Sequence, residues 1–314
     1  MSSAAATTFA RPLRILAAFG LILVGSACAL APGVNLRDTD HPLVGRIWDT
    51  AAAAFIDEDQ LRQRAGLAEV LLLGETHDNP EHHRLQRRML RMGRNGAARP
   101  ALLMEQFDVD QQTAIDEAVN NGADLKPLLR GWDWLQYREL IAEAQSAGMP
   151  LRAGNLPRAS LRPVVREGFG SLATTEITRL GLEVTWNEAR EKFMLRAIES
   201  SHCGKITPPL REGLVRAQRL RDATLADTAL ANIGRGVVFV LGRVHARHDV
   251  GVPRYLEVRR PGTRVLSIGL VEVSAGRTDP AQYETESAGT AAPHDLIWFT
   301  PRVERPDPCL NFGK

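Results

Sequence analysis

The 314-residue sequence lacks the marks of several protein classes. It contains three cysteines, too few for a small disulfide-rich scaffold. Four signatures are absent: G-x-S-x-G, H-E-x-x-H, the Walker loop and the G-x-G-x-x-G dinucleotide loop. Their absence argues against a serine α/β-hydrolase, a zincin and a nucleotide enzyme. Hydrophobic residues make up 44% and charged residues 24%, which excludes a disordered, collagenous or coiled-coil chain.

The sequence also has little net charge. Arg11 and Arg14 lie in residues 1–27, which contain no acidic residue. Beyond them, 37 basic residues balance 37 acidic residues. A neutral chain has no bulk electrostatic attraction for nucleic acid, so we expect no nucleic-acid partner.

The N-terminus reads as an export signal. Arg11 and Arg14 precede an apolar run from Ile15 to Val24, and small residues lead to Cys28. This order is typical of a secretory signal, and the run is shorter than the roughly 20 residues of a membrane-spanning helix. We interpret residues 1–27 as a lipoprotein signal peptide with Cys28 lipidated, followed by a linker over 28–42. The mature chain would face the periplasm from the outer membrane.

An alternative interpretation keeps export but removes the anchor. A lipobox usually has Leu three positions before its cysteine, and this sequence has Gly25 there. Ordinary cleavage, after Ala29 for example, would release a soluble periplasmic protein.

Export also affects the interpretation of Cys203 and Cys309. In an oxidising compartment a disulfide between them is the favoured interpretation. The alternative is that Cys203, beside His202, ligates a metal.

Short apolar runs bounded by turn residues recur along the chain and predict strands buried on both faces. They are 70–73, 101–104, 151–153, 237–241, 265–270 and 296–299. Helical patterns follow at 80–92, after Asp110 and at 134–146. We therefore predict an α/β domain over 43–310, with a mostly parallel central sheet flanked by helices. Residues 156–235 lack strand-like runs and predict a helical insert, chiefly 183–199 and 209–233.

Ionisable residues follow three of the predicted strands. Glu75 and His77 follow the first, Glu105 the second, and His245 the fourth in chain order. In a parallel sheet the carboxyl ends of the strands share one edge, so these side chains should converge. Two histidines and two carboxylates can bind Zn²⁺ or Mn²⁺, or serve as general acid and base on a water.

The segment Trp132–Tyr137 is rich in aromatic residues. One interpretation is a core helix, with Trp134, Tyr137, Ile141 and Ala144 on one face. The other is an aromatic wall for a flat ligand, with the phenol of Tyr137 as an axial ligand of haem.

Several strings in one order make the chain resemble the ChaN family of haem-binding lipoproteins. They are LLLGETHDNPEHHRLQ, LLMEQF, WDWLQY, NLPR, SHCG, AQRLRDAT, GRVHARHDVGVP and DPC. The family shares a superfamily with the erythromycin esterases and the Tiki proteases. The resemblance implies an α/β fold and a haem-linked lipoprotein of iron uptake that can form a homodimer around its ligand.

The resemblance also implies site residues. Glu75, His77, Glu105 and His245 occupy positions that bind metal or activate water in the hydrolytic relatives. The candidate haem-binding residues are Tyr137, Trp134, His83, Arg243 and Arg247. Arg243 fills a position where a small residue is common, and it could bind a haem propionate or displace a metal.

Three hypotheses follow. The leading one is an exported lipoprotein that binds haem during iron uptake. The second is a hydrolase, with or without a divalent metal, in which His77 is the base and Glu75, Glu105 and His245 support it. The third is a binding module in which these residues are only structural.

Overall fold

The computed structural model describes Met1 and residues 34–92, 99–183, 186–283, 287–288 and 292–310. Residues 2–27 of the predicted signal peptide and Cys28 lie outside the described residues. Residues 31–314 form one compact unit. Within the described ranges, no helix has the length and apolar character needed to cross a membrane.

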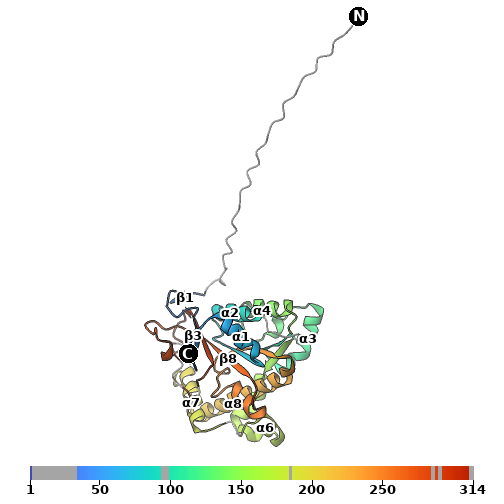
Figure 1. Ribbon diagram of the computed structural model, residues 1–314. Coiled ribbons are helices and arrows are strands. Elements are labelled where there is room, and N and C mark those ends of the chain that lie inside the picture. Colours follow the sequence, from blue (N-terminus) through green and yellow to red (C-terminus); the bar gives the residue numbers. More distant parts are fainter. Residues whose placement is uncertain (2–33, 93–98, 184–185, 284–286, 289–291, 311–314) are drawn as a thin grey trace. The chain divides into compact units, whose positions relative to one another are not determined.

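The unit is built on an eight-stranded mixed sheet in the order β3-β2-β9-β8-β4-β7-β5-β6. Figure 1 shows helices on both sides of this sheet. The strands from β9 to β6 pair in parallel, and β2 pairs antiparallel with β3 and β9. The bounds are β2 Ile47–Asp49, β3 Ala54–Ile56, β4 Val70–Glu75, β5 Ala101–Asp108, β6 Leu151–Asn155, β7 Val237–Gly242, β8 Val265–Glu272 and β9 Leu296–Thr300. A separate ribbon pairs β1 (Leu36–Arg37) with β10 (Arg302–Val303).

Two helical layers cover the sheet. The first contains α1 (Glu58–Leu67), α2 (Pro80–Met92), α3 (Gln112–Asn121) and α4 (Trp134–Ser146). The second contains α5 (Arg158–Glu167), α6 (Thr174–Leu180), α8 (Pro208–Asn232) and α9 (Val252–Arg259). Alternate side chains of β4 enter the two cores: Leu71 and Leu73 pack under the first layer, Val70 and Leu72 under the second. This two-sided burial explains the continuous apolar runs of the strands.

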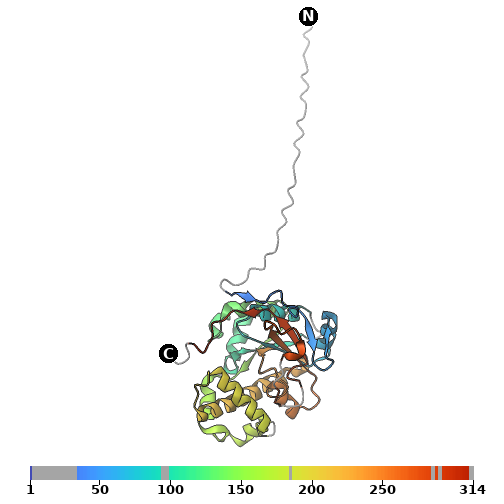
Figure 2. The ribbon, with the colours of Figure 1, turned by 90° about the vertical axis from the view of Figure 1, so that its left-hand side faces the viewer.

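The predicted α/β architecture is confirmed. Each of the six apolar runs begins a strand at its first predicted residue, and the helices predicted at 80–92 and 134–146 have those bounds. The predicted insert forms α5, α6, α7 (Glu188–Ser201) and α8 between β6 and β7, and Figure 2 shows these helices gathered together. The helix predicted at 183–199 begins later, at Glu188. Asn187 is its N-cap, and Asn187 Oδ1 accepts a hydrogen bond from the Arg190 amide over 3.0 Å.

Candidate functional site

The predicted strand-end residues do meet at the carboxyl edge of the sheet. Glu75 ends β4, Glu105 lies in β5, and β7 runs between these two strands. His77 follows β4 in the chain, and His245 follows β7. The side chains of Glu75, His77, Glu105 and His245 lie in one connected group of contacts, which we call the strand-end group.

Glu75 is the buried anchor of this group, with 2% of its surface exposed. Its oxygens accept hydrogen bonds over 2.6–3.1 Å from Tyr137 Oη, His77 Nδ1, Gln86 Nε2 and Gln106 Nε2. Burial alone would raise its pKa. The nearby charge of His83 and the His77 hydrogen bond outweigh that effect, so the pKa of Glu75 is lowered. The carboxylate is therefore held in its charged form.

His77 is held between two carboxylates. Its Nδ1 lies 2.9 Å from Glu75 Oε1, and its Nε2 lies 3.3 Å from Glu105 Oε1. Burial lowers the pKa of His77, but these two carboxylates outweigh burial and raise it. The side chain is still 41% exposed, so it is the part of the group that solvent or a ligand can reach.

His245 pairs with a residue from the helical insert. Its Nδ1 lies 2.6 Å from Asp222 Oδ1, and its Nε2 lies 3.8 Å from Glu105 Oε2. Burial raises the pKa of Asp222; for His245, the Asp222 charge outweighs burial and raises the pKa. Both shifts favour a proton retained by the pair. The sequence places Asp222 with Gln218 and Arg221 on one helix face but gives no sign of the partner.

Two glycines allow the strand ends to approach. A Cβ on Gly242 would lie 3.0 Å from His77 Nε2, and one on Gly74 would lie 2.8 Å from the Ala246 Cβ. Each glycine of the repeated G-x-x-H pattern therefore makes room for the turn that follows the other strand. This reciprocal packing explains why both turns begin with glycine.

A metal at this site gains no support from the geometry. Within the described part of the chain, no group of three or more His, Cys, Asp or Glu side chains is arranged to hold a metal ion. The contacts among Glu75, His77, Glu105 and His245 are instead those of hydrogen-bonded acids and bases, which can bind and transfer protons.

The predicted haem-binding residues lie in several places. Tyr137 is 1% exposed and donates to Glu75 over 2.6 Å, while His83 is buried against its ring, with centroids 4.6 Å apart. Trp134 packs partly buried against the first core. Arg247 is buried in a two-point ion pair with Asp249. These roles stay predictions, as does that of the half-buried Arg243.

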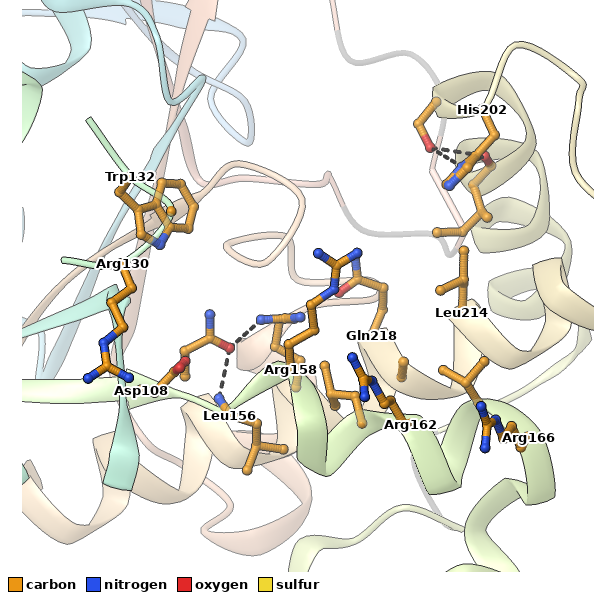
Figure 3. Close-up of a pocket in the computed structure, with 18 residues that line it drawn as sticks. Asp108, Arg130, Trp132, Leu156, Arg158, Arg162, Arg166, His202, Leu214 and Gln218 are labelled. Atoms are coloured by element: carbon orange, nitrogen blue, oxygen red, sulfur yellow. Dashed lines mark hydrogen bonds between the residues drawn. The ribbon is translucent and has the colours of Figure 1, made fainter. Parts of the chain in front are cut away.

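A cavity of about 760 Å³ lies beside the strand-end group. Its walls come from the loop before α4, the end of β6, α5, the end of α7, and α8 (Figure 3). Trp132 lines the cavity, and its ring lies 4.7 Å from that of His77. Asn155 also lines it and donates to the Glu105 carbonyl over 2.8 Å. The cavity therefore adjoins the strand-end group, and its volume is within the roughly 300–1,000 Å³ of small-molecule sites.

Arginines dominate the charge of this cavity. Arg158, Arg162 and Arg166 project from α5 at four-residue spacing, and Arg130 and Arg221 lie nearby in the wall. Asp108 is the single acidic residue of the described lining. None of the three α5 arginines forms a hydrogen bond or ion pair with another described side chain.

Between these charges the wall is apolar. Leu156, Leu161, Val165, Ile198 and Leu214 contribute hydrocarbon surface. Gln218 contributes a buried Oε1 that has no hydrogen-bond partner among the described residues. The combination suits an amphipathic anion. The four-residue spacing of Arg158, Arg162 and Arg166 was the sequence signal for this cavity wall. Arginine is abundant throughout the chain, so the spacing did not stand out.

Comparisons with known proteins agree with this fold. The structure titled "Cofacial heme binding to ChaN of Campylobacter jejuni" superposes with a TM-score of 0.63 at 19% identity, covering 80% of this chain and 95% of that one. A mutant erythromycin esterase in its open conformation has a TM-score of 0.41 at 13% identity, covering 71% and 77%, a likeness too weak to define a shared fold. No curated protein matches the chain by sequence. The model of the family described as "Haem-binding uptake, Tiki superfamily, ChaN" matches residues 61–256, and the chain belongs to this family.

Proposed function

We propose that the chain binds haem in the arginine-lined cavity. The observation that carries the proposal is the set of α5 arginines without acidic partners beside an apolar wall. Haem is a flat, mostly apolar ring with two carboxylates, so it matches both parts of the wall. Membership of a haem-binding family supports the same ligand.

The residues have distinct roles in this proposal. Arg158, Arg162 and Arg166 would bind the propionates, because guanidinium groups form charge-assisted hydrogen bonds to carboxylates. Leu161 and Val165 would exclude water from the ring. Bound haem would supply the iron that the proposed uptake delivers.

Titration of the purified chain with ferric haem tests the proposal. We expect a saturable Soret shift near one haem per chain. Arg162→Gln should weaken binding by about 10-fold, since hydrogen bonds to charged groups contribute about 1.5–3 kcal/mol. Arg138→Gln is the matched control, because Arg138 is also an exposed helix arginine but lies outside the cavity lining. Absence of saturable binding, or equal effects of both substitutions, would contradict the proposal.

We further propose that the chain is an outer-membrane lipoprotein facing the periplasm. The basic, apolar and small-residue order before Cys28 supports export, and the disulfide between Cys203 and Cys309 suits an oxidising compartment. Cells fed labelled palmitate should label the full chain, and Cys28→Ala should abolish that label. An unlabelled, soluble periplasmic chain would identify ordinary cleavage instead.

We also propose that the chain takes part in iron uptake and that two copies of it pair when haem is bound. Cells without the chain should grow more slowly when haem is the sole iron source. A homodimer should appear in sedimentation when haem is added. Unchanged growth would contradict a role in uptake, and a monomer at saturating haem would contradict pairing.

A second candidate function is hydrolysis at the strand-end group. The favouring observation is that Glu105 Oε2 is buried without a hydrogen-bond partner among the described residues, between His77 and His245. This arrangement could hold a water and move its proton. A panel of chromogenic esters and amides should reveal activity that His77→Ala removes while haem binding persists. Equal rates in His77→Ala and the unaltered chain would rule it out.

A further inference from the structure

Two residues of the cavity wall contact the strand-end group directly. Trp132 packs its ring against that of His77, with centroids 4.7 Å apart, and Asn155 donates to the Glu105 carbonyl over 2.8 Å. His77 is also the member of the group whose side chain is 41% exposed. A ligand in the cavity therefore lies next to residues that can bind and transfer protons.

Arg221 lies at the boundary between the cavity and the strand-end group. It lines the cavity and donates to Asn155 Oδ1. It also precedes Asp222, the partner of His245, in α8. Burial raises the pKa of Asp222, and the charge of Arg221 is one of the effects that oppose this rise. A guanidinium at this place has further N–H groups that can stabilise negative charge developing on a carbonyl oxygen.

The α5 arginines form a row that leads away from this boundary. Arg158 begins α5 three residues after Asn155, and Arg166 lies eight residues further along, a rise of about 12 Å. In Figure 3, Arg166 lies farther from Trp132 than Arg158 does. The row therefore offers cationic positions at increasing distances from the strand-end group.

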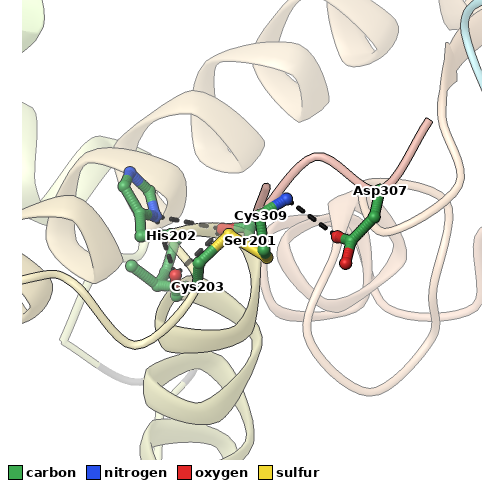
Figure 4. The surroundings of a disulfide bond; sticks show 6 residues. Ser201, His202, Cys203, Asp307 and Cys309 are labelled. Atoms are coloured by element: carbon green, nitrogen blue, oxygen red, sulfur yellow. Dashed lines mark hydrogen bonds between the residues drawn. A yellow bond between two sulfur atoms is a disulfide. The ribbon is translucent and has the colours of Figure 1, made fainter. Parts of the chain in front are cut away.

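The end of α7 lies across the cavity from Trp132 (Figure 3). Ile198, Ser201 and His202 contribute to the lining there. The next residue, Cys203, forms a disulfide with Cys309, and their Cα atoms are 5.5 Å apart (Figure 4). The bond ties this part of the wall to the C-terminal segment and gives the cavity a defined far end.

We propose that the cavity and the strand-end group form one hydrolytic site for amphipathic esters that carry a terminal anion. This inference rests on the second candidate function, hydrolysis at the strand-end group. The scissile carbonyl would lie beside His77, and the apolar chain along Leu161 and Val165. The anion would bind the α5 arginine that the length of the chain reaches. A substrate and haem would exclude each other, because both need the same arginines.

The hydrolytic step requires the ester and one water. The water oxygen bonds to the carbonyl carbon, and the bond from that carbon to the alcohol oxygen breaks. Nε2 of His77 takes one proton from the water, and this proton leaves on the alcohol. The carboxylic acid that forms releases its proton to solvent. The α5 arginines take no part in bond breaking and act on the choice of substrate.

The test uses two matched pairs of chromogenic esters and the full chain. The short pair is para-nitrophenyl hydrogen adipate and para-nitrophenyl hexanoate, which differ in the terminal carboxylate. The long pair is the hydrogen sebacate and the decanoate, whose four extra methylenes match roughly the 6 Å rise of four helical residues. In each pair kcat/KM should be about 10-fold higher for the anionic ester, since hydrogen bonds to charged groups are strong.

The variants measure the ratio of anionic to neutral kcat/KM. Arg158→Gln should lower this ratio by about 10-fold in the short pair, and Arg166→Gln should do so in the long pair. Arg138→Gln is the control, because Arg138 is an exposed helix arginine outside the described cavity lining. His77→Ala and His77→Gln should abolish turnover of all four esters, which assigns the hydrolysis to this site.

The outcomes separate the inference from the function on which it rests. If no ester is hydrolysed in a His77-dependent way, the second candidate function and this inference are overturned together. If hydrolysis depends on His77 but the anionic and neutral esters react alike, the substrate class is overturned alone. A ratio that Arg158→Gln, Arg166→Gln and Arg138→Gln change equally also overturns it.

Discussion

Asp222 in α8 holds Nδ1 of His245 over 2.6 Å and thereby links the helical insert to the carboxyl end of the sheet. Both side chains are largely buried, with 4% of Asp222 and 13% of His245 exposed. The insert therefore takes part in the strand-end group.

Removal of Asp222 should destabilise the chain. Asp222→Ala leaves a buried imidazole without its partner and should lower the free energy of unfolding by about 3–5 kcal/mol. Asp222→Asn keeps an acceptor and should cost less, about 1–3 kcal/mol. Urea unfolding of the three proteins measures both values, and equal losses would show that the hydrogen bond to His245 contributes little.

Close packing of α5 on α8 shapes the cavity. A Cβ at Gly213 would lie 2.4 Å from the Val165 carbonyl oxygen, so Gly213→Ala should push the two helices apart. We expect a loss of about 1–3 kcal/mol in urea unfolding and weaker haem binding. Gly234→Ala is the control, because its Cβ would meet nothing within 4 Å; its stability should change by less than about 0.5 kcal/mol. Similar losses in both variants would contradict this steric explanation.

Loss of the disulfide should weaken both fold and ligand site. The bond joins residues 106 positions apart, and the double substitution Cys203→Ser and Cys309→Ser should cost about 2–4 kcal/mol. We also expect lower haem affinity, because the end of α7 loses its tether. A reductant should destabilise the unaltered chain in urea and leave the double variant unchanged. A double variant as stable as the unaltered chain would refute the prediction.

Acid should destabilise the chain through His82. This side chain is fully buried, accepts the Thr76 amide hydrogen at Nδ1 over 2.8 Å, and pairs Nε2 with Thr300 Oγ1 over 2.9 Å. Burial lowers the pKa of His82 to about 3. The unfolded chain, whose imidazole titrates near 6.5, therefore binds a proton that the folded chain excludes.

Above about pH 6.5, His82 therefore does not reduce the free energy of unfolding. As the pH falls from there toward 3, protonation of the unfolded chain lowers the free energy of unfolding progressively. One such proton gives a slope of about 1.4 kcal/mol per pH unit. His82→Gln should reduce the slope of unfolding free energy against pH between 6 and 4, whatever it does to stability at pH 8. An unchanged slope would show that other groups control acid unfolding.

The strands and the meeting of their ends could be predicted because both depend on local pattern. Runs such as 237–241 are apolar throughout, and the edge they share follows from parallel pairing. The core-helix interpretation of α4 also fits, since Tyr137, Ile141 and Ala144 are buried on one face.

The cavity and the Asp222 contact could not be predicted in the same way. An exposed stripe such as Arg158, Arg162 and Arg166 has the same sequence pattern as any solvated helix face. Only the packing of α8 and α7 opposite α5 makes it a cavity wall. The partner of Asp222 is His245, which lies in a turn more than 20 residues further along the chain. Helical periodicity relates residues within one helix and so could not predict this contact.

The bond between Cys203 and Cys309 also sets an order of assembly. Cys309 follows β9 and β10 in the chain, so its thiol can reach the end of α7 only after every strand of the main sheet has been synthesised. The insert can fold earlier, but its last helix turn before Cys203 is locked at the final step. The end of α7, which contributes to the cavity wall, is therefore tethered only once the C-terminal segment is present.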